Sequence, residues 1–95
     1  MKGKSKKSRA VFVVLNDKGL HTRPSTELVK CAATFKSQVM LTYQGETINA
    51  KSLLGILMFA ATRGSKIRVT AEGEDAEEAV KSILILARSK FHIKY

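Results

Sequence analysis

A histidine stands where the sequence predicts the start of a helix. The segment GLHTRPST spans residues 19–26, and the apolar residues that follow it recur at helical spacing. The residue before a helix is normally Ser, Thr, Asp or Asn, because its side-chain oxygen accepts a hydrogen bond from one of the first free amides of the helix. An imidazole does this poorly. We therefore expect the free amides beside His21 to remain available to a ligand.

The chemistry that fits this arrangement is the transfer of a phosphoryl group. A helix N-terminus presents free N–H groups and about half a positive charge, and so it binds phosphate. A nitrogen of His21 could hold the phosphoryl group covalently, while Arg23 adds charge-assisted hydrogen bonds. We predict His21 and Arg23 as catalytic residues and Thr22 and Arg23 as phosphate contacts. Gly19 allows the turn and lets another protein approach closely. The alternative, that His21 is an ordinary loop residue at a helix start, stays open at this stage.

Other chemistries have weaker support in the sequence. The only other histidine is His92, and Cys31 lies on the apolar stripe of a predicted helix, so no zinc-ligand spacing exists. No Ser/His/acid or Cys/His arrangement points to nucleophilic hydrolysis. A glycine-rich nucleotide loop is absent as well. We therefore expect neither a metal nor a cofactor.

A second segment of interest is NAKSLLGILMFA, residues 49–60, which has more apolar surface than a short helix can bury on one side. We expect part of it to be exposed and, with Lys51, Arg63 and Arg23 around it, to dock acidic proteins. A fully buried helix is the alternative. Ser52 stands at the start of this helix, where its hydroxyl fits an N-cap, and in the middle of the proposed docking surface. Lys51 is a predicted partner-binding residue at the border of this surface.

The spacing of apolar residues predicts the element order β-α-β-β-α-β-α. Short β-branched or alternating segments predict strands at residues 9–15, 38–43, 47–50 and 66–71, the first of them buried. Helical stripes predict helices at residues 22–35, 51–62 and 74–91, with Gly64 as the stop of the second. This order favours an α+β open-faced β-sandwich, in which three helices cover one face of a four-stranded antiparallel sheet.

The composition limits the class of protein. A length of 95 residues fits one domain. Five of the 17 basic residues lie in MKGKSKKSR, and without them the net charge of +9 falls to +4. We assign residues 1–8 to a basic disordered tail and residues 9–95 to a single domain. The tail could bind RNA or lipid, but charge alone is a weak signal, and we favour a solubilising role. A single cysteine, no signal peptide and no apolar run of about 20 residues predict a cytoplasmic protein that does not insert into membranes.

Taken together, GLHTRPST, KSLLG and the element order resemble HPr, the histidine-containing phosphocarrier family of the bacterial phosphoenolpyruvate-dependent phosphotransferase system. The resemblance runs from about Arg9 to Ala87. It implies that His21 is phosphorylated on Nδ1, that Arg23 is its partner in the active centre, and that Ser52 matches a serine that an ATP-dependent kinase phosphorylates in many members. It also implies that the helix residues Leu53, Leu54 and Leu57 bind the partner proteins. Thr22 departs from the alanine that the family more often has, and the basic N-terminal extension is unusual for the family.

The resemblance implies a carrier that is a substrate of phosphotransferases and has no turnover of its own. Its partners would be an enzyme I-like donor and an acceptor domain of a sugar permease or regulator, and we expect a monomer. The alternative function is a regulatory binding module whose Ser52 face docks on a transcription factor or enzyme. Nucleic-acid binding through the tail is a poorer explanation, since the sheet lacks an aromatic pair for stacking bases.

Overall fold

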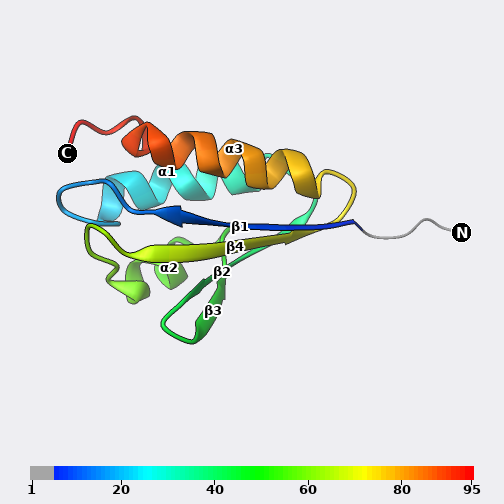
Figure 1. Ribbon diagram of the computed structural model, residues 1–95, viewed down its shortest axis with the longest axis horizontal. Coiled ribbons are helices and arrows are strands. Elements are labelled where there is room, and N and C mark those ends of the chain that lie inside the picture. Colours follow the sequence, from blue (N-terminus) through cyan, green and yellow to red (C-terminus); the bar gives the residue numbers. More distant parts are fainter. Residues whose placement is uncertain (1–5) are drawn as a thin grey trace, which may run out of the picture.

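The computed structural model describes residues 6–95 and has the predicted order of elements (Figure 1). The strands are β1 (Lys7–Val13), β2 (Gln38–Tyr43), β3 (Glu46–Asn49) and β4 (Lys66–Glu72). The helices are α1 (Thr22–Ala33), α2 (Leu53–Phe59) and α3 (Ala76–Arg88), followed by a short 3-10 turn at Lys90–His92. Within residues 6–95, no helix is long and apolar enough to cross a membrane.

All strand pairs in the sheet are antiparallel, and the strand order is β1-β4-β2-β3. β4 therefore lies between β1 and β2, although it is the last of the four strands in the chain. β2 and β3 form a hairpin, and Gln44 and Gly45 in its turn have φ values of 51° and 81°. Positive φ at both central residues is typical of a two-residue turn that follows the twist of the sheet.

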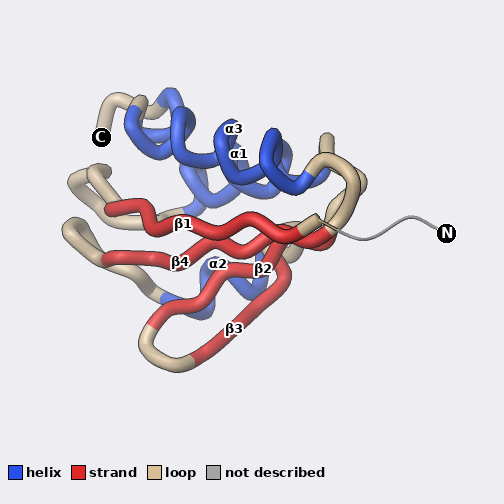
Figure 2. The backbone as a smooth tube through the Cα atoms, turned by 45° about the vertical axis from the view of Figure 1, so that its right-hand side comes forward, coloured by secondary structure: helices blue, strands red, loops and turns tan. Residues whose placement is uncertain are grey.

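α1 and α3 lie side by side over the sheet, and α2 lies next to α1 and β3 (Figures 1 and 2). Alternate residues of the strands are buried in the core: Phe12, Val39, Leu41, Ile67, Val69 and Ala71. The predicted stripe of α3 is buried too: Ala76, Ala79, Val80, Ile83 and Ala87. The predicted fold class, an α+β open-faced β-sandwich, is confirmed.

The first strand differs from the prediction in its bounds and in its burial. It begins at Lys7, so Lys7 and Ser8 pair with β4 and do not belong to a tail. Residues 1–5 of the predicted tail lie outside the described residues. The prediction of a buried strand is wrong as well, because Val11 and Val13 are 53% and 39% exposed. β1 is an edge strand of a sheet with one uncovered face, so only alternate side chains reach the core.

α2 is shorter than predicted and ends at Phe59. The next residue, Ala60, has a left-handed conformation with φ 51°, and its N–H bonds back into the last turn. The chain leaves the helix here because the carbonyl of Ala61 accepts a hydrogen bond from the N–H of Leu20, at 2.9 Å. Gly64, the predicted stop, lies in the loop that follows. Helical periodicity cannot anticipate a stop that a distant segment imposes.

The loop before α1 packs tightly against the loop after α2. Gly19 has φ +69°, and a Cβ atom at this position would lie 2.2 Å from the carbonyl oxygen of Ala61. Only glycine fits both the backbone conformation and the contact. The close approach that we expected Gly19 to offer to another protein is thus made within the chain. It fixes the start of α1 beside the end of α2.

At the other end of the sheet, Asp75 joins the turn before α3 to the loop after α1. Its carboxylate accepts hydrogen bonds from the hydroxyl and the N–H of Ser37 and from the N–H of Lys36. The Ser37 hydroxyl is the main cause that lowers the pKa of Asp75 from 3.8 to about 2, and the Lys36 amide adds to it. A carboxyl group with a lowered pKa stabilises the fold only while it is ionised.

We expect Asp75→Asn to lower the melting temperature at pH 7, because the amide replaces a carboxylate that accepts three hydrogen bonds. The lowered pKa means that this contribution is complete above about pH 4 and is lost as the pH falls through about 2. Thermal unfolding of both proteins across this range is the measurement. A difference in melting temperature that stayed constant down to pH 2 would contradict the prediction.

We expect Gly19→Ala to lower the free energy of unfolding more than Gly45→Ala does. Gly45 is the matched control, because it has φ +81° but no atom within 4 Å of the added Cβ. Left-handed backbone costs an alanine about 1–2 kcal/mol at either position, and only Gly19→Ala adds the clash with Ala61. Urea unfolding measures both losses. Equal losses would show that the contact with Ala61 is unimportant.

Candidate functional site

His21 is the N-cap residue of α1, as predicted. Its backbone is extended (φ −76°, ψ −170°), and its side chain makes no capping hydrogen bond. Within the described residues, no hydrogen bond uses the N–H of Thr22 or Arg23, and Pro24 has no N–H. The first turn of α1 therefore presents two free amides beside the imidazole. An anion at this position would meet both of them and the positive end of the helix.

Buried neighbours hold His21 at this position. The Ser25 hydroxyl donates to the carbonyl of Leu20 at 2.9 Å, and the N–H of Ser25 donates to the carbonyl of His21 at 3.1 Å. Leu20, Pro24 and Ser25 are all buried. These contacts fix the path by which the loop enters the helix. The imidazole of His21 is partly exposed, whereas the preceding Leu20 is buried and the following Thr22 is exposed.

The two ring nitrogens of His21 have different surroundings. Nε2 is buried and has no hydrogen-bond partner within the described residues. Nδ1 does not belong to the buried atoms that lack a partner. No hydrogen bond to another described residue occupies Nδ1. A ligand approaching from solvent would therefore meet Nδ1 first.

The predicted partner Arg23 lies beside His21, but it contacts a residue that the sequence did not suggest. Its Nη1 donates to the hydroxyl of Tyr95 at 2.8 Å. The ring of Tyr95 stacks on the imidazole of His21, with centroids 5.6 Å apart and planes 21° apart. The ammonium group of Lys18 lies 5.0 Å from the centre of the same ring. The site therefore contains three charged or titratable side chains around one aromatic ring.

Sequence analysis missed Tyr95 and the residue that places it. Asn16 is fully buried, and its amide donates to the carbonyl of Lys90 at 2.9 Å and to that of Tyr95 at 3.4 Å. Figure 1 shows the last segment of the chain at the same end of the molecule as the loop before α1. A polar residue directly after the predicted strand 9–15 is the only signal in the sequence, and it does not identify its partner.

The predicted docking helix is exposed on one side. Leu54 and Met58 are 71% and 75% exposed and lie one turn apart, and Leu53 is 37% exposed. Leu57 is only half-buried, while Ile56 and Phe59 face the core. The alternative of a fully buried helix is therefore wrong. Because Ala61 binds the loop before His21, the C-terminal end of α2 lies close to the start of α1.

The polar residues at the start of α2 have local roles. Ser52 caps the helix, and its hydroxyl accepts a hydrogen bond from the N–H of Gly55 at 3.1 Å, as predicted. Lys51 donates from Nζ to the carbonyl of Phe35 at 2.8 Å. Its charge therefore lies near the C-terminal end of α1, where a cation is favoured. A partner that used Lys51 would have to compete with this bond.

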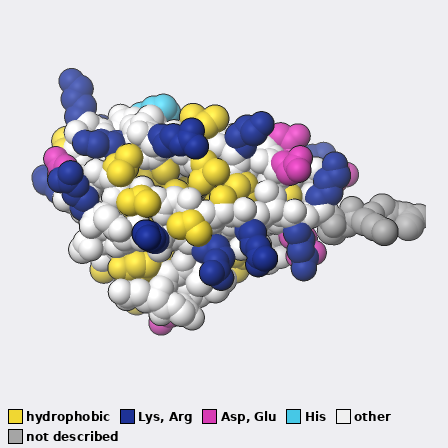
Figure 3. All heavy atoms as spheres, in the orientation of Figure 1, with side chains coloured by type: hydrophobic (Ala, Val, Ile, Leu, Met, Phe, Trp, Pro, Cys, Tyr) yellow, Lys and Arg dark blue, Asp and Glu magenta, His cyan; other side chains and the backbone are white. Residues whose placement is uncertain are grey.

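Acidic and basic residues are unevenly distributed over the molecule. Five of the eight acidic residues fall between Glu72 and Glu78. In Figure 3, acidic side chains gather near the start of α3, and Lys and Arg side chains are spread along the rest of that face. The loop before α1 lies at the opposite end (Figure 1). The site is thus far from the acidic cluster.

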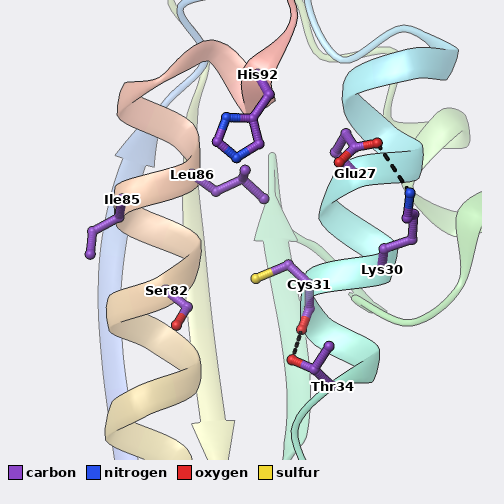
Figure 4. Close-up of a pocket in the computed structure, with 8 residues that line it drawn as sticks. All are labelled: Glu27, Lys30, Cys31, Thr34, Ser82, Ile85, Leu86 and His92. Carbon is purple, nitrogen blue, oxygen red and sulfur yellow. Dashed lines mark hydrogen bonds and ion pairs between the residues drawn. The ribbon is translucent and has the colours of Figure 1, made fainter.

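A groove of about 420 Å³ between α1 and α3 is separate from this site (Figure 4). Cys31 lines its middle and His92 one end, with Leu86 between them. Burial raises the pKa of the Cys31 thiol, which keeps it in the less reactive protonated form. Within residues 6–95, no group of three or more His, Cys, Asp or Glu side chains could hold a metal ion.

Comparison with known proteins agrees with this geometry. A family profile described as the "PTS HPr component phosphorylation site" matches residues 8–89. "Phosphocarrier protein HPr" of Xylella fastidiosa is 36% identical over 81 residues, which cover 85% of this chain and 91% of that protein. The protein of the same name from Cupriavidus necator is 37% identical over 78 residues, covering 82% and 88% of the two chains.

The fold has a matching solved structure. The crystal structure of HPr-C-His from Thermoanaerobacter tengcongensis superposes with a TM-score of 0.88 at 34% identity. The match covers 93% of this chain and 99% of that one. Sequence and fold agree over nearly the whole length, and the chain therefore belongs to the HPr family, the phosphocarriers of the phosphotransferase system.

Proposed function

We propose that His21 is the residue on which this phosphocarrier holds the phosphoryl group, and that Nδ1 is the accepting atom. The observation that carries this proposal is an unoccupied ring nitrogen beside the free amides of Thr22 and Arg23. The amides and the guanidinium of Arg23 would bind the phosphoryl oxygens.

The transfer replaces one phosphorus–nitrogen bond by another. The lone pair of Nδ1 attacks phosphorus while the bond to the donor's histidine nitrogen breaks, and that nitrogen keeps the electron pair. Attack by Nδ1 requires the proton of the imidazole to be on Nε2, which is buried. Free amides and Arg23 stabilise the charge on the three phosphoryl oxygens in the transition state. The reverse exchange passes the group to the acceptor.

We propose two partners that would use the same arrangement. An enzyme I-like donor and an acceptor domain, from a sugar permease or a regulator, would each contact α2 through Leu53, Leu54 and Leu57 while reaching His21. The two partners cannot bind at once, so the carrier must be free between encounters, and we propose that it works as a monomer in the cytoplasm. It is then a substrate of two phosphotransferases, with no turnover of its own.

We expect incubation with phosphoenolpyruvate and enzyme I to add one acid-labile phosphoryl group to the protein, measured by intact mass. His21→Ala should abolish this label, because it removes the accepting nitrogen. His92→Ala is the matched control and should be labelled at the wild-type rate, since the only other histidine lies in the separate groove. Acid-labile label on His21→Ala would disprove the assignment.

Ser52 is the proposed point of regulation, through a serine kinase. Its hydroxyl caps α2 and lies next to exposed Leu53 and Leu54. A phosphate here would carry about −1.5 to −2 charge, which the start of a helix tolerates. The same charge would repel an acidic donor at the docking surface. This also supports the second candidate function, a regulatory module whose Ser52 face binds a transcription factor or enzyme.

We expect Ser52→Asp to weaken donor binding and to slow phosphorylation of His21, most strongly at low ionic strength. Ser52→Asn is the matched control, because Asn and Asp cap helices equally well and differ in charge. Circular dichroism and melting temperature should stay close to wild type for both variants. Binding and transfer rates that were equal for the two at low salt would leave Ser52 as a helix cap only.

A further inference from the structure

We propose that Tyr95 is a positioning residue for phosphoryl transfer: its ring orients the imidazole of His21, and its hydroxyl holds Arg23 beside it. The proposal rests on the assignment of His21 as the phosphoryl acceptor. Tyr95 makes both contacts at once, a stack with centroids 5.6 Å apart and a hydrogen bond of 2.8 Å from Nη1 of Arg23. No other described residue contacts both side chains in this way.

Tyr95 is held in place by residues that are themselves buried. Phe91 is fully buried against Phe12, with ring centroids 6.0 Å apart, and Ile93 is 7% exposed. The buried amide of Asn16 donates to the carbonyl of Tyr95 at 3.4 Å. These contacts anchor the segment after α3 on both sides of Lys94. The phenol ring therefore lies over His21 because the core fixes its backbone.

The stack leaves the reacting nitrogen open. The lone pair of an imidazole nitrogen lies in the plane of the ring, so a phosphoryl group must arrive along that plane. Tyr95 covers a face of the ring, since the two planes differ by only 21°. It therefore restricts the rotation of the imidazole without blocking the path to Nδ1. Holding a nucleophile in its reactive orientation lowers the entropic cost of transfer.

The hydrogen bond acts on Arg23 in a similar way. A guanidinium has five N–H donors in a rigid fork, and the bond to Tyr95 uses one of them. The others remain available to phosphoryl oxygens. A free arginine side chain would sample many rotamers and would have to be ordered in each transfer. The neutral phenol keeps Arg23 near the site without competing strongly with the charged phosphoryl group.

Two substitutions separate these effects. Tyr95→Phe removes the hydroxyl and keeps the stack, and Tyr95→Ala removes both. Tyr43→Phe is the matched control, because its hydroxyl contacts Ser65 at 3.1 Å in another part of the molecule. The rate of phosphoryl transfer from enzyme I is measured with each variant over a range of carrier concentrations. Melting temperatures report any effect on the fold.

We expect the maximal transfer rate to fall about five-fold in Tyr95→Phe, as loss of one hydrogen bond implies. It should fall further in Tyr95→Ala, and the carrier concentration for half-maximal rate should change little, because α2 is untouched. All variants should still reach one phosphoryl group per chain. Tyr43→Phe should transfer at the wild-type rate.

The unphosphorylated protein gives a second readout. In NMR spectra, the ring current of Tyr95 should shift the imidazole protons of His21 upfield, in wild type and Tyr95→Phe but not in Tyr95→Ala. If the wild type is labelled and Tyr95→Ala transfers at an equal or higher rate, the proposed role of Tyr95 is wrong. The role of His21 would then still stand. Label on His21→Ala would instead remove the proposed acceptor, and with it this proposal.

Discussion

The hydrogen bond from the N–H of Leu20 to the carbonyl of Ala61 joins two loops that are far apart in the sequence. It places the residue before His21 against the residues that follow α2. Gly19 permits the bond, because any Cβ at that position would collide with the carbonyl of Ala61. The free amides of α1 and the C-terminal end of α2 are therefore held close together.

The sequence predicted well what depends on neighbouring residues. Alternation in KIRVTA correctly predicted a strand, and the apolar stripe of α3 correctly predicted a helix. Burial of one face requires alternate apolar residues in a strand and apolar residues at helical spacing in a helix. Ser52 was identified as a cap because capping is local. The same rule drew attention to His21, because an imidazole caps a helix poorly and leaves the first amides free.

Features set by distant contacts were not predicted. The end of α2 at Phe59 depends on the bond between Ala61 and Leu20, which no helical pattern records. The exposure of Val11 follows from the uncovered face of the sheet, and the run of apolar residues in β1 does not reveal which of them point to that face. Tyr95 reaches His21 only because Asn16, Phe91 and Ile93 fold the last segment back onto the core.

The strand order β1-β4-β2-β3 has a consequence for how the protein is made. Among residues 6–95, β1 pairs only with β4, and β4 leaves the ribosome after β2 and β3. Until then β1 has no hydrogen-bonding partner in the sheet, and its pairing is a contact of long sequence separation, which forms slowly. A nascent chain that has exposed His21 therefore does not yet hold Leu20 against Ala61 or the imidazole against Tyr95. The histidine is synthesised before β4 and Tyr95, and the site around it is complete only when residues 91–95 have folded.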